Sequence, residues 1–142
     1  MNATIEKFGY PENLLAEDEH WVVLLRPAQV TLGSLVLACK ELATSFSLVS
    51  AAAWADLPKM TSQLEQALAR SFEHEKINYL ALMMVDKEVH FHVLPRYSGP
   101  REFAGMTFTD DAWPKPTDIT NTMEMSDKQF AGLRQLLLKN WS

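Results

Sequence analysis

Two histidines and a carboxylate alternate with apolar residues in the second half of the chain. Along the run from Glu88 to Leu94, an extended backbone places Glu88, His90 and His92 on one face and Val89, Phe91 and Val93 on the other. Residues two apart on a strand lie about 6.6 Å apart along it. His90 and His92 are therefore spaced to act together on one small anionic group.

Three chemistries fit this face. A divalent metal could be bound with Glu88 and with His20 or His74 arriving from elsewhere, but ligands spread over five strand residues span about 13 Å, so no metal site is expected. A neutral imidazole nitrogen could instead attack phosphorus and form a phospho-histidine intermediate. The third use is to hold a phosphate or carboxylate without turnover.

The two histidines and the residues that follow them resemble the signature of the histidine-triad (HIT) family of nucleotide hydrolases and transferases. Residues 90–96 read His-Phe-His-Val-Leu-Pro-Arg, and the family motif alternates three histidines with apolar residues and often continues as Val-Leu-Pro-Arg. The order of elements is similar over about residues 20–97. The resemblance implies that His90 is the nucleophile on the α-phosphorus and that His92 helps to bind the phosphate.

Two positions depart from the family pattern. Glu88 stands where the first histidine of the triad is expected, and Met84 stands where many relatives carry a polar residue that contacts phosphate. An ionised Glu88 can orient an imidazole by accepting its N–H, but at 4 Å from a phosphate oxygen its repulsion is on the order of 4 kcal/mol at an effective dielectric of 20. Arg26 and Arg96 are candidate compensating cations, and Asn78 resembles a polar position of the family. The predicted substrate-binding set is therefore His92, Asn78, Glu88, Arg96 and Arg26.

Apolar, β-branched runs and turn residues predict the first half of the fold. One strand is expected over residues 20–25, because Arg26-Pro27 stops it. Its antiparallel partner is expected over residues 32–39, with Gly33 where the backbone is crowded. The stretch 45–55 is ambiguous between strand, helix and loop. A helix is expected from a cap at Asp56, with Pro58 in its first turn, to residue 72.

The second half of the chain is expected to complete a sheet and close it with a helix. Two strands, 77–85 and 88–94, are separated by Asp86-Lys87, which predicts a tight hairpin. Residues 97–125 are rich in Gly and Pro and are expected to be mostly loop. Ser126 with Gln129 three residues later predicts a capping box that begins a final helix.

These elements predict an α+β fold, a HIT-like twisted antiparallel sheet of about five strands with one long helix and a C-terminal helix. We expect one domain over residues 1–142, with the motif-bearing core in 20–97 and a C-terminal extension in 98–142. The resemblance implies that the protein forms a homodimer. It also implies that the reaction requires no cofactor.

Composition excludes several classes of function. A formal net charge of −5 argues against nucleic acid as a partner, and no apolar run reaches the roughly 20 residues of a membrane span. The single cysteine, Cys39, and an acidic N-terminal segment unlike a targeting peptide predict a cytoplasmic protein.

The sequence therefore predicts a hydrolase that acts on the α-phosphate of a nucleotide conjugate or dinucleoside polyphosphate, such as diadenosine polyphosphate, through a nucleotidyl-histidine intermediate. The alternative is a non-catalytic nucleotide-binding relative, because Glu88 replaces the first histidine.

Overall fold

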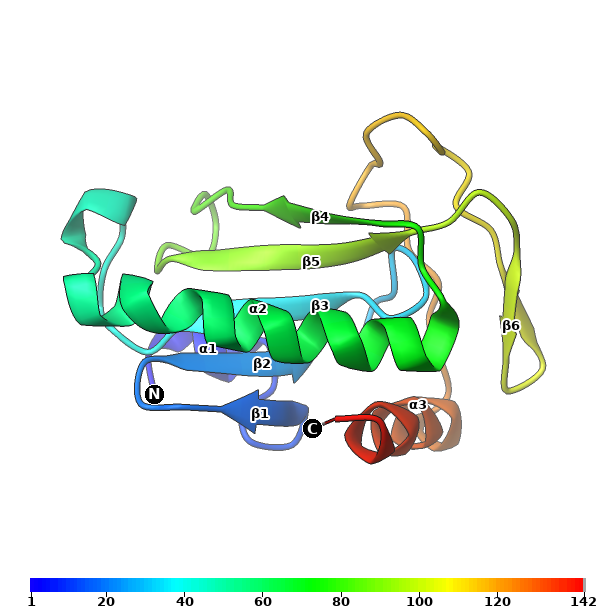
Figure 1. The fold of residues 1–142 in the computed structure, drawn as a ribbon, viewed down its shortest axis with the longest axis horizontal. Helices are drawn as coiled ribbons and strands as arrows, with labels where there is room; N and C mark the ends of the chain where they lie inside the picture. Colours follow the sequence, from blue (N-terminus) through cyan, green and yellow to red (C-terminus); the bar gives the residue numbers. More distant parts are fainter. Residues whose placement is uncertain (142) are drawn as a thin grey trace.

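A five-stranded antiparallel sheet is the centre of the protein, whose computed structural model describes residues 1–141 (Figure 1). The strand order is β1-β2-β3-β5-β4, and every neighbouring pair runs antiparallel. The strands are β1 (Leu14–Glu17), β2 (Trp21–Leu25), β3 (Leu35–Cys39), β4 (Lys76–Leu80) and β5 (His90–Arg96). The predicted α+β architecture, with about five strands, a long helix and a C-terminal helix, is confirmed.

Strands β2 and β3 form the predicted antiparallel pair. Their register runs from Trp21 opposite Cys39 to Leu25 opposite Leu35, and all residues of both strands are buried. The segment 32–34, expected to belong to the second strand, instead forms a turn in which Ser34 Oγ donates to the carbonyl of Thr31. Burial on both faces explains why these strands are apolar throughout rather than alternating.

The long helix α2 (Ala51–Phe72) covers one face of the sheet. It begins earlier than predicted, because Ser50 rather than Asp56 caps it by accepting from the backbone N–H of Ala53. The carboxylate of Asp56 pairs with His20 Nδ1 at 2.6 Å instead, and Pro58 lies inside the helix. The ambiguous stretch 45–55 thus contains a 3-10 turn, η1 (Phe46–Leu48), followed by the start of α2.

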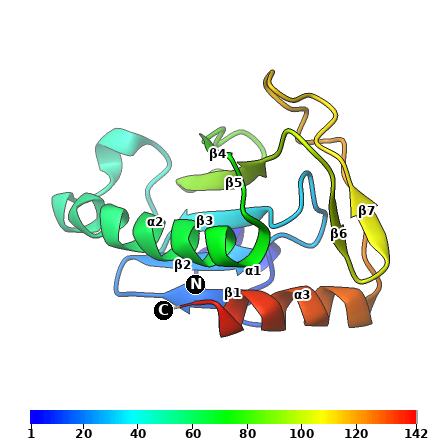
Figure 2. The same cartoon turned by 45° about the vertical axis from the view of Figure 1, so that its right-hand side comes forward.

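The opposite face is covered by a short N-terminal helix that the sequence analysis did not predict. Helix α1 (Ala3–Lys7) is capped by Asn2, and its residue Ile5 is fully buried. Figure 2 shows α1 and α2 on opposite sides of the sheet. Ile5 belongs to an apolar cluster with Val22, Leu24, Val36 and Ala38.

The connection between β4 and β5 differs from the predicted tight hairpin. The two strands pair antiparallel, with Asn78 opposite Leu94, but β4 ends at Leu80 and β5 begins at His90. Residues 81–89 form a loop in which Met83 has a φ of 45°. The apolar residues at 82–85 have the composition of a buried strand, but Leu82, Met84 and Val85 are exposed.

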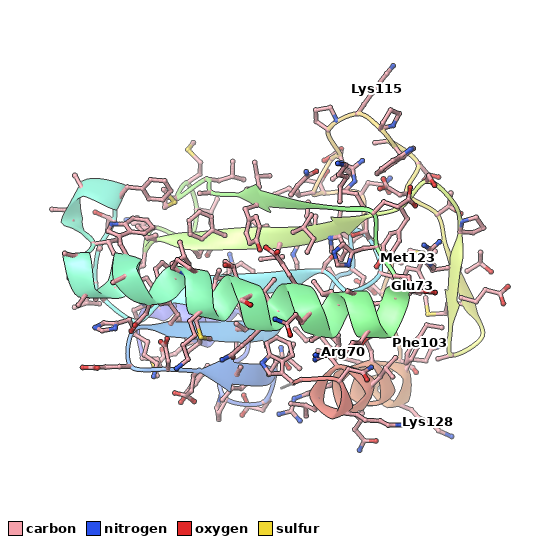
Figure 3. All side chains as sticks on the ribbon, viewed as in Figure 1. Arg70, Glu73, Phe103, Lys115, Met123 and Lys128 are labelled. Carbon is pink, nitrogen blue, oxygen red and sulfur yellow. The ribbon has the colours of Figure 1, made fainter. Side chains whose placement is uncertain are left out.

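The C-terminal extension contains a hairpin where loop was expected. Strands β6 (Arg101–Phe103) and β7 (Met106–Phe108) pair around Ala104 and Gly105, both with positive φ, as a type I′ turn requires. The chain then runs through a long irregular segment with Lys115 pointing outward (Figure 3). It rejoins the body where Met123 bridges to Gln29.

The final helix, α3 (Asp127–Lys139), packs beside α2 and β1. Its predicted capping box is confirmed, since Ser126 Oγ accepts from the N–H of Gln129 while the Gln129 side chain accepts from the N–H of Ser126. Leu133 and Leu137 are its buried residues. None of the helices in residues 1–141 combines the length and the apolarity that a bilayer crossing requires.

We predict that Gly33→Ala destabilises the protein more than Gly105→Ala. Gly33 has a φ of 91°, and a Cβ there would lie 2.9 Å from Leu68 Cδ2, whereas Gly105 has a φ of 78° with open space around it. The first variant combines backbone strain with overpacking and should lose roughly 2–4 kcal/mol of unfolding free energy; the second should lose about 1–2 kcal/mol. Urea unfolding measures both values, and equal losses would show that contact with α2 is unimportant.

Candidate functional site

Register places both histidines on the sheet face opposite α2. In the β3–β5 pair, His92 lies opposite Val36 and His90 lies opposite Ala38. Directly opposed residues of an antiparallel pair share a face, and Val36 and Ala38 pack with Ile5 beneath α1. The predicted projection of the two imidazoles to one side is therefore observed, with ring centroids 5.2 Å apart and nearly perpendicular.

A backbone carbonyl fixes the tautomer of His90. Its Nδ1 lies 2.8 Å from the carbonyl oxygen of Glu88, which only accepts, so Nδ1 carries the proton. In the neutral ring, Nε2 then holds the free lone pair. This arrangement orients the ring and leaves a nucleophilic nitrogen available.

His92 is held in its neutral form. Burial, then the positive charge of Arg26, then the neighbouring His90 lower the pKa of His92 to about 4. Its Nδ1 is buried and has no hydrogen-bond partner among residues 1–141. An unpaired buried N–H is costlier than an unpaired lone pair, which favours the tautomer with the proton on Nε2, ready to donate.

Arg26 supplies positive charge beside the histidines. It follows β2, and both of its Nη atoms donate to the carbonyl of Ile119 at 3.4 Å. Its own carbonyl accepts from the side chain of the buried Gln29, which also bonds Gly33 and Ser34. Arg26 has no carboxylate within ion-pair distance in the described part of the chain.

These three side chains converge on one cavity of about 440 Å³. Helix α1 and its C-cap, the β4–β5 loop and the C-terminal extension supply the rest of its wall. The complete lining is Lys7, Phe8, Arg26, Leu82, Met84, Val85, Asp86, His90, His92, Ile119 and Thr120. An unpaired guanidinium beside two imidazoles is an arrangement suited to a phosphate or carboxylate.

Glu88 does not belong to the lining of this cavity. Its carboxylate accepts a long hydrogen bond, 3.4 Å, from the backbone N–H of Thr4, and its own N–H donates to Thr4 Oγ1 at the same distance. Its carbonyl orients His90, as described above. Glu88 thus connects α1 to His90, and a direct substrate contact by its carboxylate stays a prediction.

Asn78 and Arg96 lie in a different cavity from His90 and His92. Arg96 is buried, with Nε 2.6 Å from Asp110 Oδ2 and Nη1 2.8 Å from Asn78 Oδ1. Its Nη2 also donates to Asp110 Oδ1 and to the carbonyl of Lys115. Both residues line a cavity of about 720 Å³ with Trp113. Their predicted substrate contacts remain untested, while their observed contacts secure the C-terminal extension.

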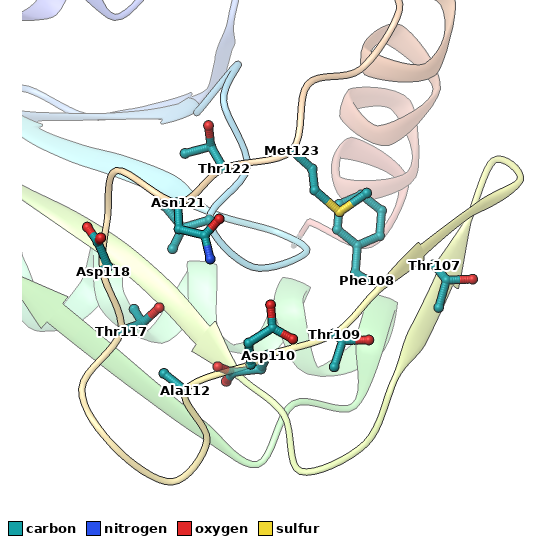
Figure 4. Close-up of a pocket in the computed structure, with 12 residues that line it drawn as sticks. Thr107, Phe108, Thr109, Asp110, Ala112, Thr117, Asp118, Asn121, Thr122 and Met123 are labelled. Atoms are coloured by element: carbon teal, nitrogen blue, oxygen red, sulfur yellow. The ribbon is translucent and has the colours of Figure 1, made fainter.

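A third cavity, of about 440 Å³, carries several carboxylates beside the extension. Figure 4 shows Asp110 and Asp118 among its lining with Thr117. Asp110 is already paired with Arg96, and Asp118 accepts from Thr120. No group of three or more His, Cys, Asp or Glu side chains within residues 1–141 is arranged to hold a metal ion.

The sequence analysis missed the N-terminal part of the site. The Phe8 ring lies 5.7 Å from both imidazole rings, and Lys7 Nζ lies 2.7 Å from Asp86 Oδ1 across the cavity. Asn2, three residues before Ile5, is the only local signal of the helix that carries them, since its side chain is the cap. No local sequence pattern predicts that Ile119 and Thr120 line the cavity, because their position depends on contacts between distant parts of the chain.

Two comparisons of the sequence give no match. No protein-family model matches the chain. No curated protein matches it either.

Comparison of structures identifies the fold. A histidine triad protein from Sinorhizobium meliloti is similar with a TM-score of 0.75 and 18% identity, covering 99% of this chain and 95% of that one. A histidine triad protein from Marinobacter aquaeolei gives a TM-score of 0.72 and 20% identity, covering 96% of both chains. A histidine triad protein from Bradyrhizobium japonicum gives 0.74 and 15%, covering 100% and 97%. The chain therefore has the HIT fold, as the sequence predicted.

We predict that His92 makes stability depend on pH between about 4 and 6.5. The folded pKa is about 4, below the unfolded value, so the unfolded state binds more protons in this window and the free energy of unfolding rises with pH. His92→Asn should flatten the rise by up to about 1.4 kcal/mol per pH unit. Urea unfolding at several pH values measures the slope.

His20→Asn is the matched control. Its hydrogen bond to Asp56 raises the pKa of His20, so its contribution to stability is complete below pH 6.5 and is lost only at higher pH. This variant should keep the wild-type slope between pH 4 and 6.5. Identical slopes for wild type and His92→Asn in that window would contradict the assignment.

Proposed function

We propose that this chain, which has the HIT fold, is a HIT family nucleotide-phosphate hydrolase. The observation that carries the proposal is the convergence of Arg26, which has no carboxylate partner within residues 1–141, with His90 and His92 in one cavity. The substrate is a nucleotide conjugate or a dinucleoside polyphosphate. A cytoplasmic location, consistent with the buried free thiol of Cys39, belongs to the same proposal.

The chemistry begins with His90. Its Nε2 lone pair attacks the α-phosphorus, forming a P–N bond while the bond to the leaving group breaks and the leaving group departs with the bonding electrons and is protonated by water. The Glu88 carbonyl, which accepts from Nδ1, stabilises the positive charge that then develops on the ring. A second water attacks phosphorus and gives a proton to the hydroxide left by the first, the P–N bond breaks with its electron pair returning to Nε2, and the nucleoside monophosphate is released.

Arg26 and His92 serve the phosphate in this proposal. The guanidinium stabilises negative charge on the phosphoryl oxygens, and its partial burial strengthens that interaction. His92, neutral at pH 7, donates from Nε2 without adding a second positive charge beside Arg26. Glu88 need not repel the substrate, because its carboxylate is directed to the N-terminus of α1.

A homodimer is the proposed assembly. Strand β4 is an edge of the sheet, and its residues Lys76, Asn78 and Tyr79 are exposed. Edge strands present unpaired backbone donors and acceptors that a second copy can use.

We predict that His90→Ala abolishes release of nucleoside monophosphate from nucleoside phosphoramidates or dinucleoside polyphosphates. Loss of the nucleophile should lower kcat by about a thousandfold or more. His20→Ala is the control, since it also removes an imidazole but one that pairs with Asp56 outside the cavity. Chromatographic assay of both substrate classes measures the rates.

Silence of the wild type and His90→Ala across both substrate classes would contradict hydrolysis. Nucleotide binding by that silent wild type would establish the non-catalytic alternative, which the glutamate at position 88 favours. Activity gained by Glu88→His would then identify the missing histidine as the cause.

We predict that Arg26→Gln weakens nucleoside monophosphate binding by about tenfold or more without a large loss of stability, because it removes a charged hydrogen-bond donor from the cavity. Arg96→Gln should instead lower the free energy of unfolding by about 3–5 kcal/mol and leave nucleotide affinity unchanged, because it leaves the buried Asp110 unpaired. Calorimetric titration and urea unfolding of both variants separate the two roles. Weaker nucleotide binding by an Arg96→Gln protein of unchanged stability would contradict this division and show that Arg96 contacts the substrate.

A further inference from the structure

Three apolar side chains of the β4–β5 loop stand exposed at the wall of the histidine cavity. Leu82, Met84 and Val85 are 43, 77 and 82% exposed, and all three line the same cavity as His90 and His92. Clustered exposed apolar side chains mark surfaces that a ligand or partner covers. The other residues that line the cavity indicate which ligand covers these three side chains.

The charges of the cavity match one singly ionised phosphate. Lys7 is neutralised by Asp86 at 2.7 Å, and His92 is uncharged at pH 7. Arg26 is then the remaining uncompensated charge in the lining. A phosphoramidate or phosphodiester carries one negative charge, whereas a polyphosphate chain would bring further negative charges that Arg26 alone does not match in a partly desolvated site.

Three of the four loop side chains in the lining are apolar, and the fourth, Asp86, is paired with Lys7. The side chains of Leu82, Met84 and Val85 offer no strong donor or acceptor, and Phe8 and Ile119 add apolar surface to the same lining. Nothing in this set would hydrogen-bond the edges of a base. An apolar group covered by these side chains would leave water, at about 0.8 kcal/mol of transfer free energy per CH₂, a factor of roughly four in affinity.

We propose that Leu82, Met84 and Val85 determine specificity for an apolar leaving group on a nucleoside monophosphate. The inference rests on the proposed function: the phosphate meets Arg26, His90 and His92, and an apolar amine, the group that departs from phosphorus, packs on the β4–β5 loop. Met84, the second most exposed of the three, is placed in this proposal to contact the leaving group.

The experiment compares two phosphoramidates of one nucleoside. One carries n-hexylamine and the other carries a hydroxyl- and ether-containing amine of the same length, with diadenosine triphosphate as a third substrate. Wild type should prefer the hexylamine conjugate by about tenfold or more in kcat/KM, in the range that a hydrophobic pocket discriminates. It should hydrolyse the triphosphate more slowly than either.

The double variant Met84→Gln/Val85→Thr should reduce the ratio of kcat/KM for the hexylamine conjugate to kcat/KM for the polar conjugate several-fold. Both positions are largely exposed, so the variant should fold as the wild type does. Leu42→Gln is the matched control, because Leu42 is 81% exposed but does not line the cavity. It should keep the wild-type ratio.

The outcomes separate the two proposals. Equal kcat/KM for both amines, an unchanged ratio in the double variant, or a ratio that falls equally in Leu42→Gln would overturn the specificity inference while leaving the hydrolase intact. A preference that follows the base rather than the amine would also overturn it. No turnover of any of the three substrates by wild type would overturn the proposed function itself, and the inference with it.

Discussion

The register of β5 against β3 is the constraint on which the site depends. Because His92 is opposite Val36 and His90 is opposite Ala38, both imidazoles lie on the face that the long helix leaves free. A shift of one residue would move both rings beneath α2 and bring Phe91 and Val93 to the cavity. The alternation of β5 itself favours this register, since the slip would place two imidazoles in the apolar core and remove the buried Val93 from it.

The two arginines show how similar residues acquire different roles from their surroundings. Arg96 is surrounded by acceptors, including both oxygens of Asp110, and its positive charge is satisfied within the fold. The Arg26 guanidinium donates at long distance to the carbonyl of Ile119, has no carboxylate within ion-pair distance among residues 1–141, and lies beside a neutral imidazole. A partly buried cation without a matching carboxylate is the feature that an anionic ligand would complete, which is why the proposed site is centred there.

Local patterns predicted the centre of the site, and long-range contacts determined the rest. Alternation along 88–94 placed His90 and His92 correctly because a strand has a period of two residues. Phe8 and Lys7 reach the cavity through contacts with residues 79 or more positions away, which no local pattern encodes. The sequence predicts strand over residues 81–85 of the loop because apolar residues that line a cavity have the same composition as apolar residues that face a core.

The most direct test is a crystal structure of the protein soaked with a nucleoside monophosphate. The account predicts phosphorus within about 3 to 3.5 Å of His90 Nε2, the distance of a near-attack geometry, with the phosphoryl oxygens contacting Arg26 and His92. A nucleotide bound instead in the cavity lined by Asn78 and Arg96, or phosphorus facing away from His90 Nε2, would contradict it.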